Sequence, residues 1–391
     1  MKKLTDFDIA SKKILARVDC NVPLDADLAI TDETRIQGIL PMVRYCIEKG
    51  AKLILMSHLG RPKDGPEQRF SLKPVADRLS EILHRPIPLA PDCIGAEVAS
   101  LVAAMQPGDL LFLENLRFHP EEKENDPAFC EKLAAFADIY INDAFAVSHR
   151  AHASVVGVPL LVPQRGAGFL LAKEMDYFNR AIRNPERPFA AVVGGAKVSS
   201  KLAALENMLE RVDTMVIGGA MANTFLKSQG IDVGASLVEE DLLETSVTLI
   251  TRAKERGVHL FLPVDAVAAE TFDAAATSRV VTVQDTPPGW MLVDIGPATR
   301  TLFAEALAGA ATIVWNGPMG AFEMAPFSAG TTEMVKILNS SQALTIVGGG
   351  DTNAAVNQSG VGENISYMST GGGAFLMLME GKALPGVEVL G

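Results

Sequence analysis

The stretch PFAAVVGGAK at residues 188–197 joins a dense apolar run to a glycine turn and a lysine. Because polar residues do not alternate with the apolar ones, the strand that this run predicts must be buried on both faces. The same unit recurs along the chain, and each run ends in Gly, Asp, Asn or His ahead of a helical pattern. The further runs are ILARVDCN (14–21), KLILMSHLG (52–60), DLLFLENLR (109–117), IYINDAF (139–145), TMVIGGA (214–220), HLFLPVDAV (259–267), WMLVDIG (290–296), TIVWNGP (312–318) and LTIVGGGD (344–351). Such strands, separated by helices, indicate parallel sheets of βαβ units, so the predicted fold class is α/β.

The length of the chain predicts two domains, since 391 residues exceed one domain of ordinary size. Between the two groups of strands, residues 168–183 have helical spacing without a breaker, and NPERP at 184–188 ends that helix. We therefore expect two Rossmann-like, three-layer parallel-sheet domains joined by a hinge helix. The expected boundaries are 1–167 for the N-terminal domain, 168–187 for the connecting helix and hinge, 188–377 for the C-terminal domain and 378–391 for a tail.

The composition narrows the class of protein. The apolar fraction of 48% with 21% charged residues is typical of a globular protein, and no apolar stretch reaches the roughly 20 residues that span a bilayer. The N-terminal sequence MKKLTDFDIASKK lacks the apolar core of a secretory signal, and the four cysteines form no CxxC pair, which together predict a cytoplasmic protein with reduced thiols. A net charge of −12 argues against a nucleic-acid partner. Any anion must therefore be bound by a local cluster of cations.

The ends of the predicted strands differ between the two halves. Ligands of open parallel sheets bind beyond the carboxyl ends of the strands, so the residues at those ends indicate what each half binds. The first half offers polar and cationic side chains, which favour a small anion: Asp19, Asn21, His58, Arg61 and Arg117. The second half offers bare backbone, which favours phosphates and a flat base: Gly194, Gly195, Gly218, Gly219, Gly296, Gly317 and 348–350, with Lys197 beside them.

The glycine turns of the second half match neither of the two common nucleotide signatures, because the chain contains no GxxxxGK[ST] and no GxGxxG. GGAKVSSK at 194–201 is expected to place Lys197 and Lys201 on one face of a first helical turn, as a phosphate site or as a solvated pair of lysines. In GGGDTN at 348–353, Asp351 could cap a helix or bind Mg²⁺. TGGGAF at 370–375 could supply free amides to a phosphoryl group or only chain flexibility.

The first half carries arginines where a phosphate or carboxylate site needs them. SHLGRP (57–62), ENLRF (114–118) and SHRAH (148–152) each place Arg or His in a loop beyond a buried strand, and Arg35 follows the turn TDETR. The planar fork of arginine suits both carboxylate and phosphate, so the ligand is expected to carry such groups. The histidines of these loops lack the spacing of a zinc site.

These segments closely resemble the phosphoglycerate kinase family over the whole chain. The resemblance rests on eight motifs in the family's order and spacing: RVDCNVP (17–23), SHLGRPK (57–63), LENLRFHPEE (113–122), HRAHAS (149–154), GGAKVSSKL (194–202), WNGPMGAFE (315–323), GGGDT (348–352) and STGGGA (369–374). One departure is Ala146-Val147-Ser148, where family members more often have Gly-Thr-Ala; it leaves the neighbouring Arg150 intact.

The resemblance implies the roles of individual residues. Residues that match the family's 3-phosphoglycerate site are Asp19, Asn21, Arg35, His58, Leu59, Gly60, Arg61, Arg117 and Arg150. Those that match its nucleotide site are Lys201, Gly218, Gly219, Gly296, Asn316, Pro318, Glu323, Gly349, Gly350, Asp351 and Thr352, with Asp351 as the implied Mg²⁺ ligand. The implied catalytic groups are Arg35, Lys197, Lys201 and the amides of 371–373, Gly372 among them.

The reaction that the resemblance implies is the reversible glycolytic step 1,3-bisphosphoglycerate + ADP ⇌ 3-phosphoglycerate + ATP, with in-line transfer and domain closure. A tail that packs back on the N-terminal domain and a monomeric state are implied as well. Two other classes share parts of the pattern. A non-catalytic binding protein for small anions would share the two lobes but has no use for lysines and an aspartate on glycine turns, and an NAD-linked dehydrogenase would need a GxGxxG turn.

Overall fold

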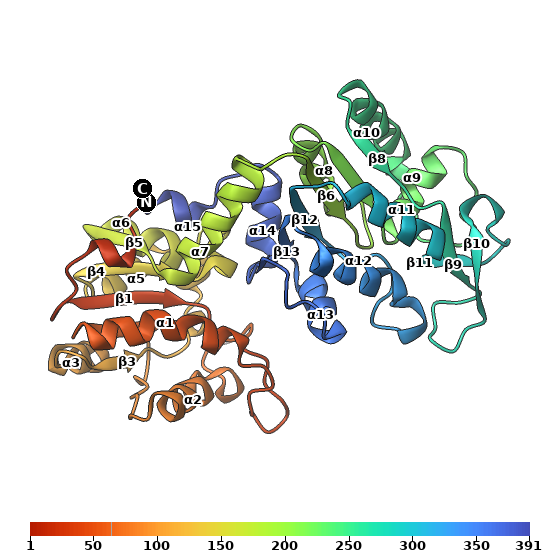
Figure 1. Cartoon of the computed structure of the whole chain (residues 1–391). Coiled ribbons are helices and arrows are strands. Elements are labelled where there is room, and N and C mark those ends of the chain that lie inside the picture. Colours follow the sequence, from red (N-terminus) through yellow and green to blue (C-terminus); the bar gives the residue numbers. More distant parts are fainter. Residues whose placement is uncertain (64) are drawn as a thin grey trace. The chain divides into compact units, whose positions relative to one another are not determined.

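The computed structural model describes residues 1–63 and 65–391, which form two compact units. The first unit comprises Met1–Asp176 and Ala383–Gly391, and the second comprises Tyr177–Lys382. Each unit is built on a parallel sheet with helices packed on it (Figure 1). The α/β class predicted from the sequence is confirmed.

The first unit has a five-stranded parallel sheet in the order β3-β2-β1-β4-β5. Its strands are β1 (Lys13–Val18), β2 (Lys52–Met56), β3 (Leu110–Phe112), β4 (Ile139–Asp143) and β5 (Gln164–Ala167). The chain moves outward from β1 to β3 and then returns to the other side of β1 with β4. The strand order therefore reverses between β1 and β4, where a ligand crevice is expected at the carboxyl ends.

Helices and short turns cover this sheet. They are η1 (Leu4–Asp6), α1 (Thr34–Glu48), η2 (Gln68–Phe70), α2 (Lys73–Leu83), α3 (Ala96–Ala104), η3 (Leu116–Phe118), α4 (Glu121–Glu124), α5 (Pro127–Ala134), η4 (Phe145–Val147), η5 (Ala153–Gly157), α6 (Val158–Leu161), α7 (Phe169–Phe178) and α15 (Pro385–Glu388). On one face, Ile14, Ala16 and Val18 of β1 join a buried apolar core with residues of α1 and α2. The opposite face meets η5, because the Tyr140 hydroxyl donates to the Ser154 carbonyl over 2.7 Å.

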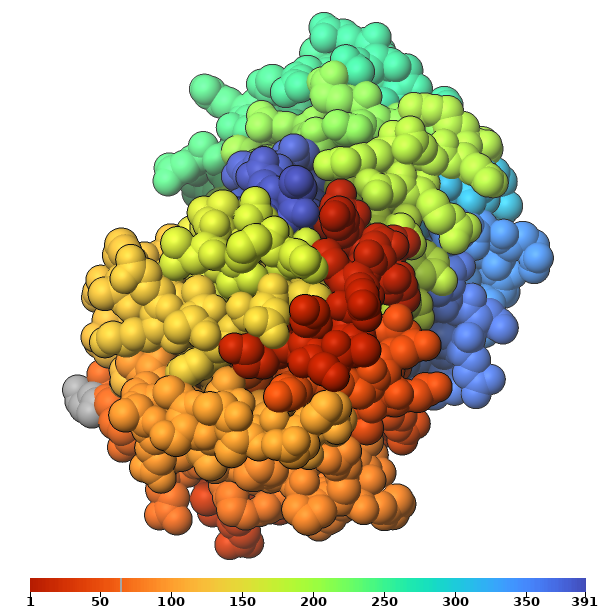
Figure 2. All heavy atoms as spheres, turned by 90° about the vertical axis from the view of Figure 1, so that its left-hand side faces the viewer, coloured from red at the N-terminus to blue at the C-terminus, as the bar shows by residue number. Residues whose placement is uncertain are grey.

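The C-terminal residues pack on the first unit. The Gly386 amide donates to the Ser148 carbonyl over 2.9 Å, and the Asn142 side-chain amide donates to the Gly386 carbonyl over 3.0 Å. A Cβ at Gly386 would press on Val155 and Ser148, so the close approach requires glycine. Figures 1 and 2 both show the two chain ends side by side.

The second unit has a six-stranded parallel sheet in the order β14-β13-β12-β6-β7-β8. Its strands are β6 (Phe189–Val193), β7 (Thr214–Ile217), β8 (His259–Phe261), β12 (Thr312–Asn316), β13 (Leu344–Gly348) and β14 (Tyr367–Met368). Its helices and turns are η6 (Asn179–Arg183), α8 (Leu202–Leu209), α9 (Met221–Ser228), η7 (Glu240–Leu242), α10 (Leu243–Glu255), η8 (Val283–Asp285), α11 (Pro297–Leu307), η9 (Ala325–Phe327), α12 (Ala329–Ser340), α13 (Gly350–Ser359) and α14 (Gly372–Met379). The strand order reverses between β6 and β12.

A second sheet of this unit corrects two of the predicted strands. The run at 290–296 was expected in a parallel sheet, but β11 (Met291–Ile295) pairs antiparallel with β9 (Asp265–Ala269), which also pairs antiparallel with β10 (Ser278–Thr282). The run at 259–267 is divided between β8 and β9 because Pro263, which has no amide hydrogen to donate to a ladder, lies between them.

The expected connecting helix at 168–183 consists of α7 followed by the π-helical turn η6. The amides of Leu170 and Leu171 donate to a carboxylate oxygen of Asp143, which satisfies the start of α7. The boundary between the two units falls inside α7, between Asp176 and Tyr177, and residues 378–382 belong to the second unit. The assignment of 168–187 as a hinge stays a prediction.

Candidate active site

Residues from three elements of the first unit meet beyond the carboxyl ends of β1 and β2. Asp19 follows β1, Arg35 is the second residue of α1, and His58 lies two residues after β2. A guanidinium nitrogen of Arg35 donates to Oδ2 of Asp19, and Oδ1 of Asp19 lies 3.9 Å from Nδ1 of His58. The parallel register that aligns β1 with β2 brings these side chains together.

A buried polar network that the sequence interpretation missed lies beneath this group. The Arg17 side chain is fully buried; its Nε donates to the Ser154 hydroxyl over 2.9 Å, and its Nη2 lies 3.1 Å from Nδ1 of His58. The Ser154 hydroxyl donates to the buried carboxylate of Glu122 over 2.6 Å. Arg17 therefore holds His58 in position from its buried side. The signal for Arg17 in the sequence is a charged residue inside the apolar run ILARV.

The turn at Gly60 joins three of the expected substrate residues. The Gly60 amide donates to Oδ1 of Asn21 over 2.7 Å, and the Arg117 guanidinium donates to the Gly60 carbonyl over 2.8 Å. Gly60 has φ +62°, and an added Cβ would collide with the ring of Phe70, so only glycine fits this turn. Leu59, also expected at the site, is buried, and its amide donates to Oδ1 of Asn115.

The cations of this group exceed its anions. Arg61, Arg117 and Arg150 form no ion pair with any described residue. Burial, and then the charges of Arg17 and Arg150, lower the pKa of Arg117 to about 10. Burial and the surrounding arginines also hold the pKa of His58 well below its usual range, so this ring is neutral. Mutually repelling cations at a strand-order reversal form a site that gains stability when an anion binds.

In the second unit, two glycine turns pack on one another beyond β6 and β12. The Gly194 amide donates to the Asn316 carbonyl over 2.9 Å, and the Gly195 amide donates to the Pro318 carbonyl over 2.9 Å. A Cβ at Gly194 or at Gly317 would collide with backbone carbonyl oxygens of the opposite turn, and Gly317 has φ +97°. The bare backbone therefore allows the two turns to approach and exposes peptide groups to a ligand.

Lys201 bridges the two turns. Its ammonium donates to the carbonyls of Gly194 and Asn316 over 2.6 and 3.0 Å. Burial lowers the pKa of Lys201 to about 8, and the nearby charge of Asp351 partly opposes this shift. An ammonium group held by two carbonyls at a strand-order reversal is positioned for a phosphate.

The expected placement of Lys197 and Lys201 on one helical face is wrong. The two lysines do not share a face of a first helical turn, because α8 begins only at Leu202 and Lys201 is its N-cap. The loop between them is held by Glu239, whose carboxylate accepts from the amide and the hydroxyl of Ser199. Lys197 is exposed, whereas Lys201 is half-buried.

The N-termini of α13 and α14 converge beside Lys201. Gly349, with φ +111°, is the N-cap of α13, so Asp351 is not the cap and its exposed carboxylate is available to a ligand. The Thr352 hydroxyl accepts from the Gly317 amide over 2.8 Å, which fastens α13 to the glycine turn after β12. A Cβ at Gly372 would lie 3.4 Å from the Gly349 Cα. The free amides of two helix starts therefore meet at one place.

The remaining residues expected at the nucleotide site lie near these turns or apart from them. Gly218 and Gly219 follow β7, and a Cβ at Gly219 would press on Gly195 and Pro318. A small hollow of about 20 Å³ beside Gly219 is lined by apolar residues of α9 and β11, by Asp294 and by Asn223, whose buried Nδ2 has no partner among the described residues. Gly296 is the N-cap of α11, directly after β11. Glu323 is exposed and forms no ion pair within the described chain.

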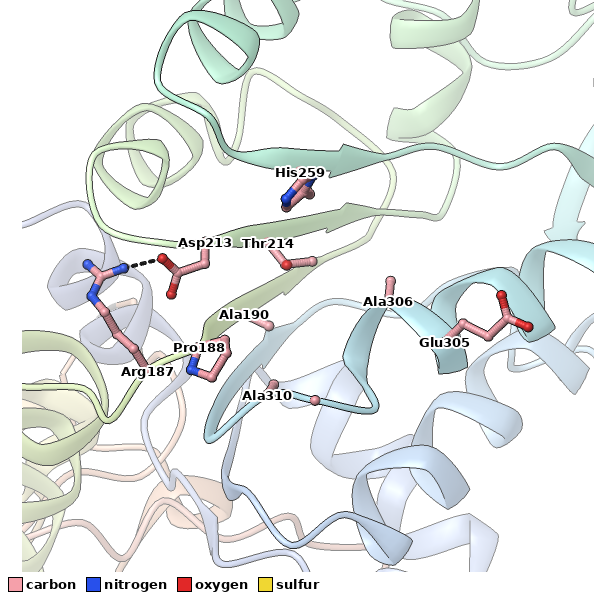
Figure 3. A pocket seen from close by; sticks show the side chains of 10 residues that line it. Arg187, Pro188, Ala190, Asp213, Thr214, His259, Glu305, Ala306 and Ala310 are labelled. Carbon is pink, nitrogen blue, oxygen red and sulfur yellow. Dashed lines mark hydrogen bonds and ion pairs between the residues drawn. The ribbon is translucent and has the colours of Figure 1, made fainter.

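A larger hollow of about 610 Å³ lies at the amino ends of the strands of the six-stranded sheet, on the side opposite the glycine turns (Figure 3). It is lined at the amino ends of β6, β7 and β8 by Pro188, Asp213 and His259, and Arg187 forms an ion pair with Asp213 there. Parallel sheets bind ligands at their carboxyl ends, and none of the expected site residues lines this hollow. The hollow at the amino edge is therefore not the nucleotide site.

The comparisons with known proteins all match phosphoglycerate kinases, over nearly the whole chain. The family model described as phosphoglycerate kinase matches residues 4–382. A phosphoglycerate kinase from Desulfotalea psychrophila is 58% identical over 390 residues, which is 100% of both chains, and one from Geotalea uraniireducens is 55% identical over 383 residues, which is 98% of this chain and 96% of that one. The structure of phosphoglycerate kinase from Coxiella burnetii matches with a TM-score of 0.92 and 40% identity, over 100% of this chain and 98% of that one. Among the described residues, no helix has the length and apolarity needed to cross a membrane. The chain belongs to the phosphoglycerate kinase family.

Proposed function

We propose that the chain catalyses its family's glycolytic reaction, 1,3-bisphosphoglycerate + ADP ⇌ 3-phosphoglycerate + ATP, with the acid bound by the first unit and the nucleotide by the second. Membership of the family makes it a kinase. The observation that supports the division of roles is the contrast at the two strand-order reversals. Arginines without an ion pair to any described residue lie at the first, and packed glycine turns with the half-buried Lys201 lie at the second.

The proposed acid site uses the surplus cations of the first unit. 3-Phosphoglycerate carries a phosphate and a carboxylate, and Arg61, Arg117 and Arg150 supply charge that no described residue neutralises. Arg35 is held in place by Asp19, and Asn21 and Arg117 hold the Gly60 turn. The neutral ring of His58 offers a hydrogen bond without adding charge.

The proposed nucleotide site uses the turns around Lys201. Its ammonium and the amides at the starts of α13 and α14 would bind the phosphates. We place the base beside Gly218 and Gly219, outside the hollow of about 20 Å³ there, which is too small to enclose it. Gly218, Gly296, Asn316, Pro318 and Glu323 complete the proposed set.

Asp351 fits the role of a Mg²⁺ ligand. Its carboxylate is exposed, lies close enough to Lys201 to oppose the shift in that lysine's pKa, and is not used as a helix cap. Mg²⁺ is commonly bound by one or two carboxylates together with phosphate oxygens, which it would neutralise here. We propose Asp351 as the protein's ligand to the metal of a Mg-nucleotide.

The chemistry needs no general base. In the direction that consumes ATP, a carboxylate oxygen of 3-phosphoglycerate attacks the γ-phosphorus, the bond to the β,γ-bridging oxygen breaks, and ADP leaves with the electron pair. The nucleophile is already ionised at neutral pH. Catalysis then rests on positioning and on charge stabilisation, for which we propose Arg35, Lys197, Lys201 and the amide of Gly372.

The transfer requires that the two bound ligands meet while water is excluded, so we propose domain closure with 168–187 as the hinge. Small-angle scattering with both substrates is expected to give a smaller radius of gyration than without them, and an unchanged value would contradict closure. We also propose a cytoplasmic monomer that binds neither nucleic acid nor membranes, which sedimentation and fractionation would test.

The function is tested by a coupled assay that follows ATP formation from 1,3-bisphosphoglycerate and ADP. Wild-type protein is expected to be active, while Arg35→Ala and Lys201→Ala lose most of the activity. Arg44→Ala on the exposed side of α1 and Lys336→Ala on α12 are matched controls that remove a surface cation from each unit. Full activity in both site variants would refute the site, and no activity in the wild type would refute the function.

A further inference from the structure

Three side chains that could bind a metal ion converge in the first unit, apart from the residues proposed above. Asp92 and Cys93 follow the short segment beside β3, where the Ala90 amide donates to the Phe112 carbonyl, and His119 directly follows η3. One ligand atom of each residue lies within 4.8 Å of the other two. Within residues 1–63 and 65–391, no other group of three or more His, Cys, Asp and Glu side chains meets this criterion.

The contacts in this cluster converge on the Asp92 carboxylate. Nε2 of His119 lies 2.7 Å from Oδ1 of Asp92, and the backbone amide of Cys93 donates to the same oxygen over 2.6 Å. The His119 ring packs at 5.4 Å from the ring of Phe129, which restricts its orientation. A cation that replaced the proton between His119 and Asp92, together with the thiol proton of Cys93, could bind all three side chains.

The burial of the three residues suits a bound ion. The Cys93 side chain is fully buried, whereas the Asp92 and His119 side chains are 42% and 24% exposed. A cation can therefore enter past the carboxylate and the imidazole and reach the sulfur at the base of the site. The nearby Glu122 carboxylate adds negative potential.

We propose that Asp92, Cys93 and His119 form a binding site for a thiophilic divalent cation of the Zn²⁺ type. Tetrahedral Zn²⁺ with bonds of about 2.0–2.3 Å places its ligand atoms about 3.3–3.8 Å apart, so the longest separation must contract by only about 1 Å. Mg²⁺ and Ca²⁺ prefer oxygen ligands and are poorly matched to a buried sulfur. On binding, the thiol proton passes to water and a water molecule completes the fourth position.

The short helix η3 connects this cluster to the residues proposed to bind 3-phosphoglycerate. Arg117 lies in η3, two residues before His119, and its amide donates to Oδ1 of Asn115. A metal on His119 would restrain this turn and so change the affinity for 3-phosphoglycerate. This consequence rests on the proposed function, but metal binding itself does not.

The direct test is titration of the full-length protein with Co²⁺, which gives a near-ultraviolet thiolate-to-cobalt band when sulfur coordinates it. We expect one equivalent of Co²⁺ to produce the band and Zn²⁺ to abolish it by displacement. Cys93→Ser should remove the band, whereas Cys130→Ser, which alters another buried cysteine of the same unit, should retain it. No band in the wild type, or an unchanged band in Cys93→Ser, would overturn the proposal.

Two further variants keep the test decisive if Cys93→Ser does not fold. Asp92→Asn and His119→Gln change partly exposed side chains and are expected to weaken Zn²⁺ binding by at least about tenfold in calorimetry, since each loses a direct ligand. Unchanged affinity in both would overturn the site. Because the titration uses no substrate, its failure is distinct from failure of the proposed kinase reaction.

Discussion

The two strand-order reversals of this molecule are built by opposite means. Beyond the carboxyl ends of β1 and β2, long cationic side chains lie together, and the buried Arg17 contacts the neutral ring of His58. Beyond β6 and β12, side chains are largely absent, and the backbone itself forms the surface around Lys201. In the proposed function, the first arrangement would distinguish a small acid by the positions of several charges, whereas the second would admit a phosphate chain to peptide groups that any Cβ would cover.

This contrast predicts different consequences of mutation. Removing Arg61 or Arg150 from the first site should lower activity while leaving the fold intact, because neither forms an ion pair with a described residue and both repel Arg117. Adding a single carbon to the second should disturb the fold, because the two turns leave no space.

The largest expected effect is that of Arg35→Ala. Loss of this cation should lower kcat/KM for 3-phosphoglycerate by about 10²–10³-fold, the range for removing one group that stabilises a transition state. Arg35→Lys should recover only part of the loss, because an ammonium cannot replace the guanidinium fork toward Asp19 and a substrate. Steady-state kinetics with Arg44→Ala as control would measure both, and a loss below threefold in Arg35→Ala would contradict the role.

The second expected effect is on stability. Gly317→Ala places a Cβ against the carbonyl of Gly194 at φ +97°, which should lower the free energy of unfolding by about 3 kcal/mol. Gly309→Ala, where nothing lies within 4 Å, should change it by less than about 1 kcal/mol. Urea unfolding of both variants measures the difference, and equal midpoints would show that the glycine turns are not tightly packed.

The third effect is a pH dependence of nucleotide binding. Lys201 has a pKa lowered to about 8 by burial, so its charge is present below pH 8 and is lost as the pH rises through that value. The affinity for ADP should therefore be highest below pH 8 and fall by up to about tenfold per unit above it, with a bound phosphate moving the transition upward. Lys201→Arg should bind with little change between pH 7 and 9. Calorimetry over this range provides the test, and identical profiles would contradict the assignment.

The smallest expected effect concerns Glu239, which holds the loop of Lys197 through Ser199. Glu239→Ala should lower kcat by about threefold to tenfold and leave KM for 3-phosphoglycerate unchanged, because it loosens the loop without touching the first unit. Glu240→Ala, which removes an exposed carboxylate paired with Lys227, is the neighbouring control. An equal loss in both variants would indicate a general effect of charge.

The sequence predicted the buried parallel strands well because their apolar runs are continuous, as in β1, β2, β6 and β12. It did not predict β5, whose residues are QRGA, or the two-residue β14, because both are too short or too polar to form an apolar run. The run at 290–296 looked like the others, yet its antiparallel pairing is decided by the tertiary partner β9.

The candidate site shows the same limits. Strand ends identified Asp19, His58 and Lys197, and the motif GGAKVSSK identified Lys201. Arg17 and Glu122 were missed because burial of a charge depends on partners distant in sequence. The spacing of Lys197 and Lys201 suggested a shared helical face, whereas the contact of Ser199 with Glu239 keeps that segment a loop. Individual substrate roles came from the family resemblance and stay predictions.

The division of roles between the two reversals is tested most directly by separate calorimetric titrations of wild type, Arg35→Ala and Lys201→Ala with 3-phosphoglycerate and with Mg-ADP. We predict a crossed pattern. Arg35→Ala should lose most of its affinity for the acid and bind Mg-ADP within about twofold of wild type, and Lys201→Ala should do the reverse. If either variant remains folded but loses affinity equally for 3-phosphoglycerate and for Mg-ADP, the two units do not divide the ligands in the way proposed.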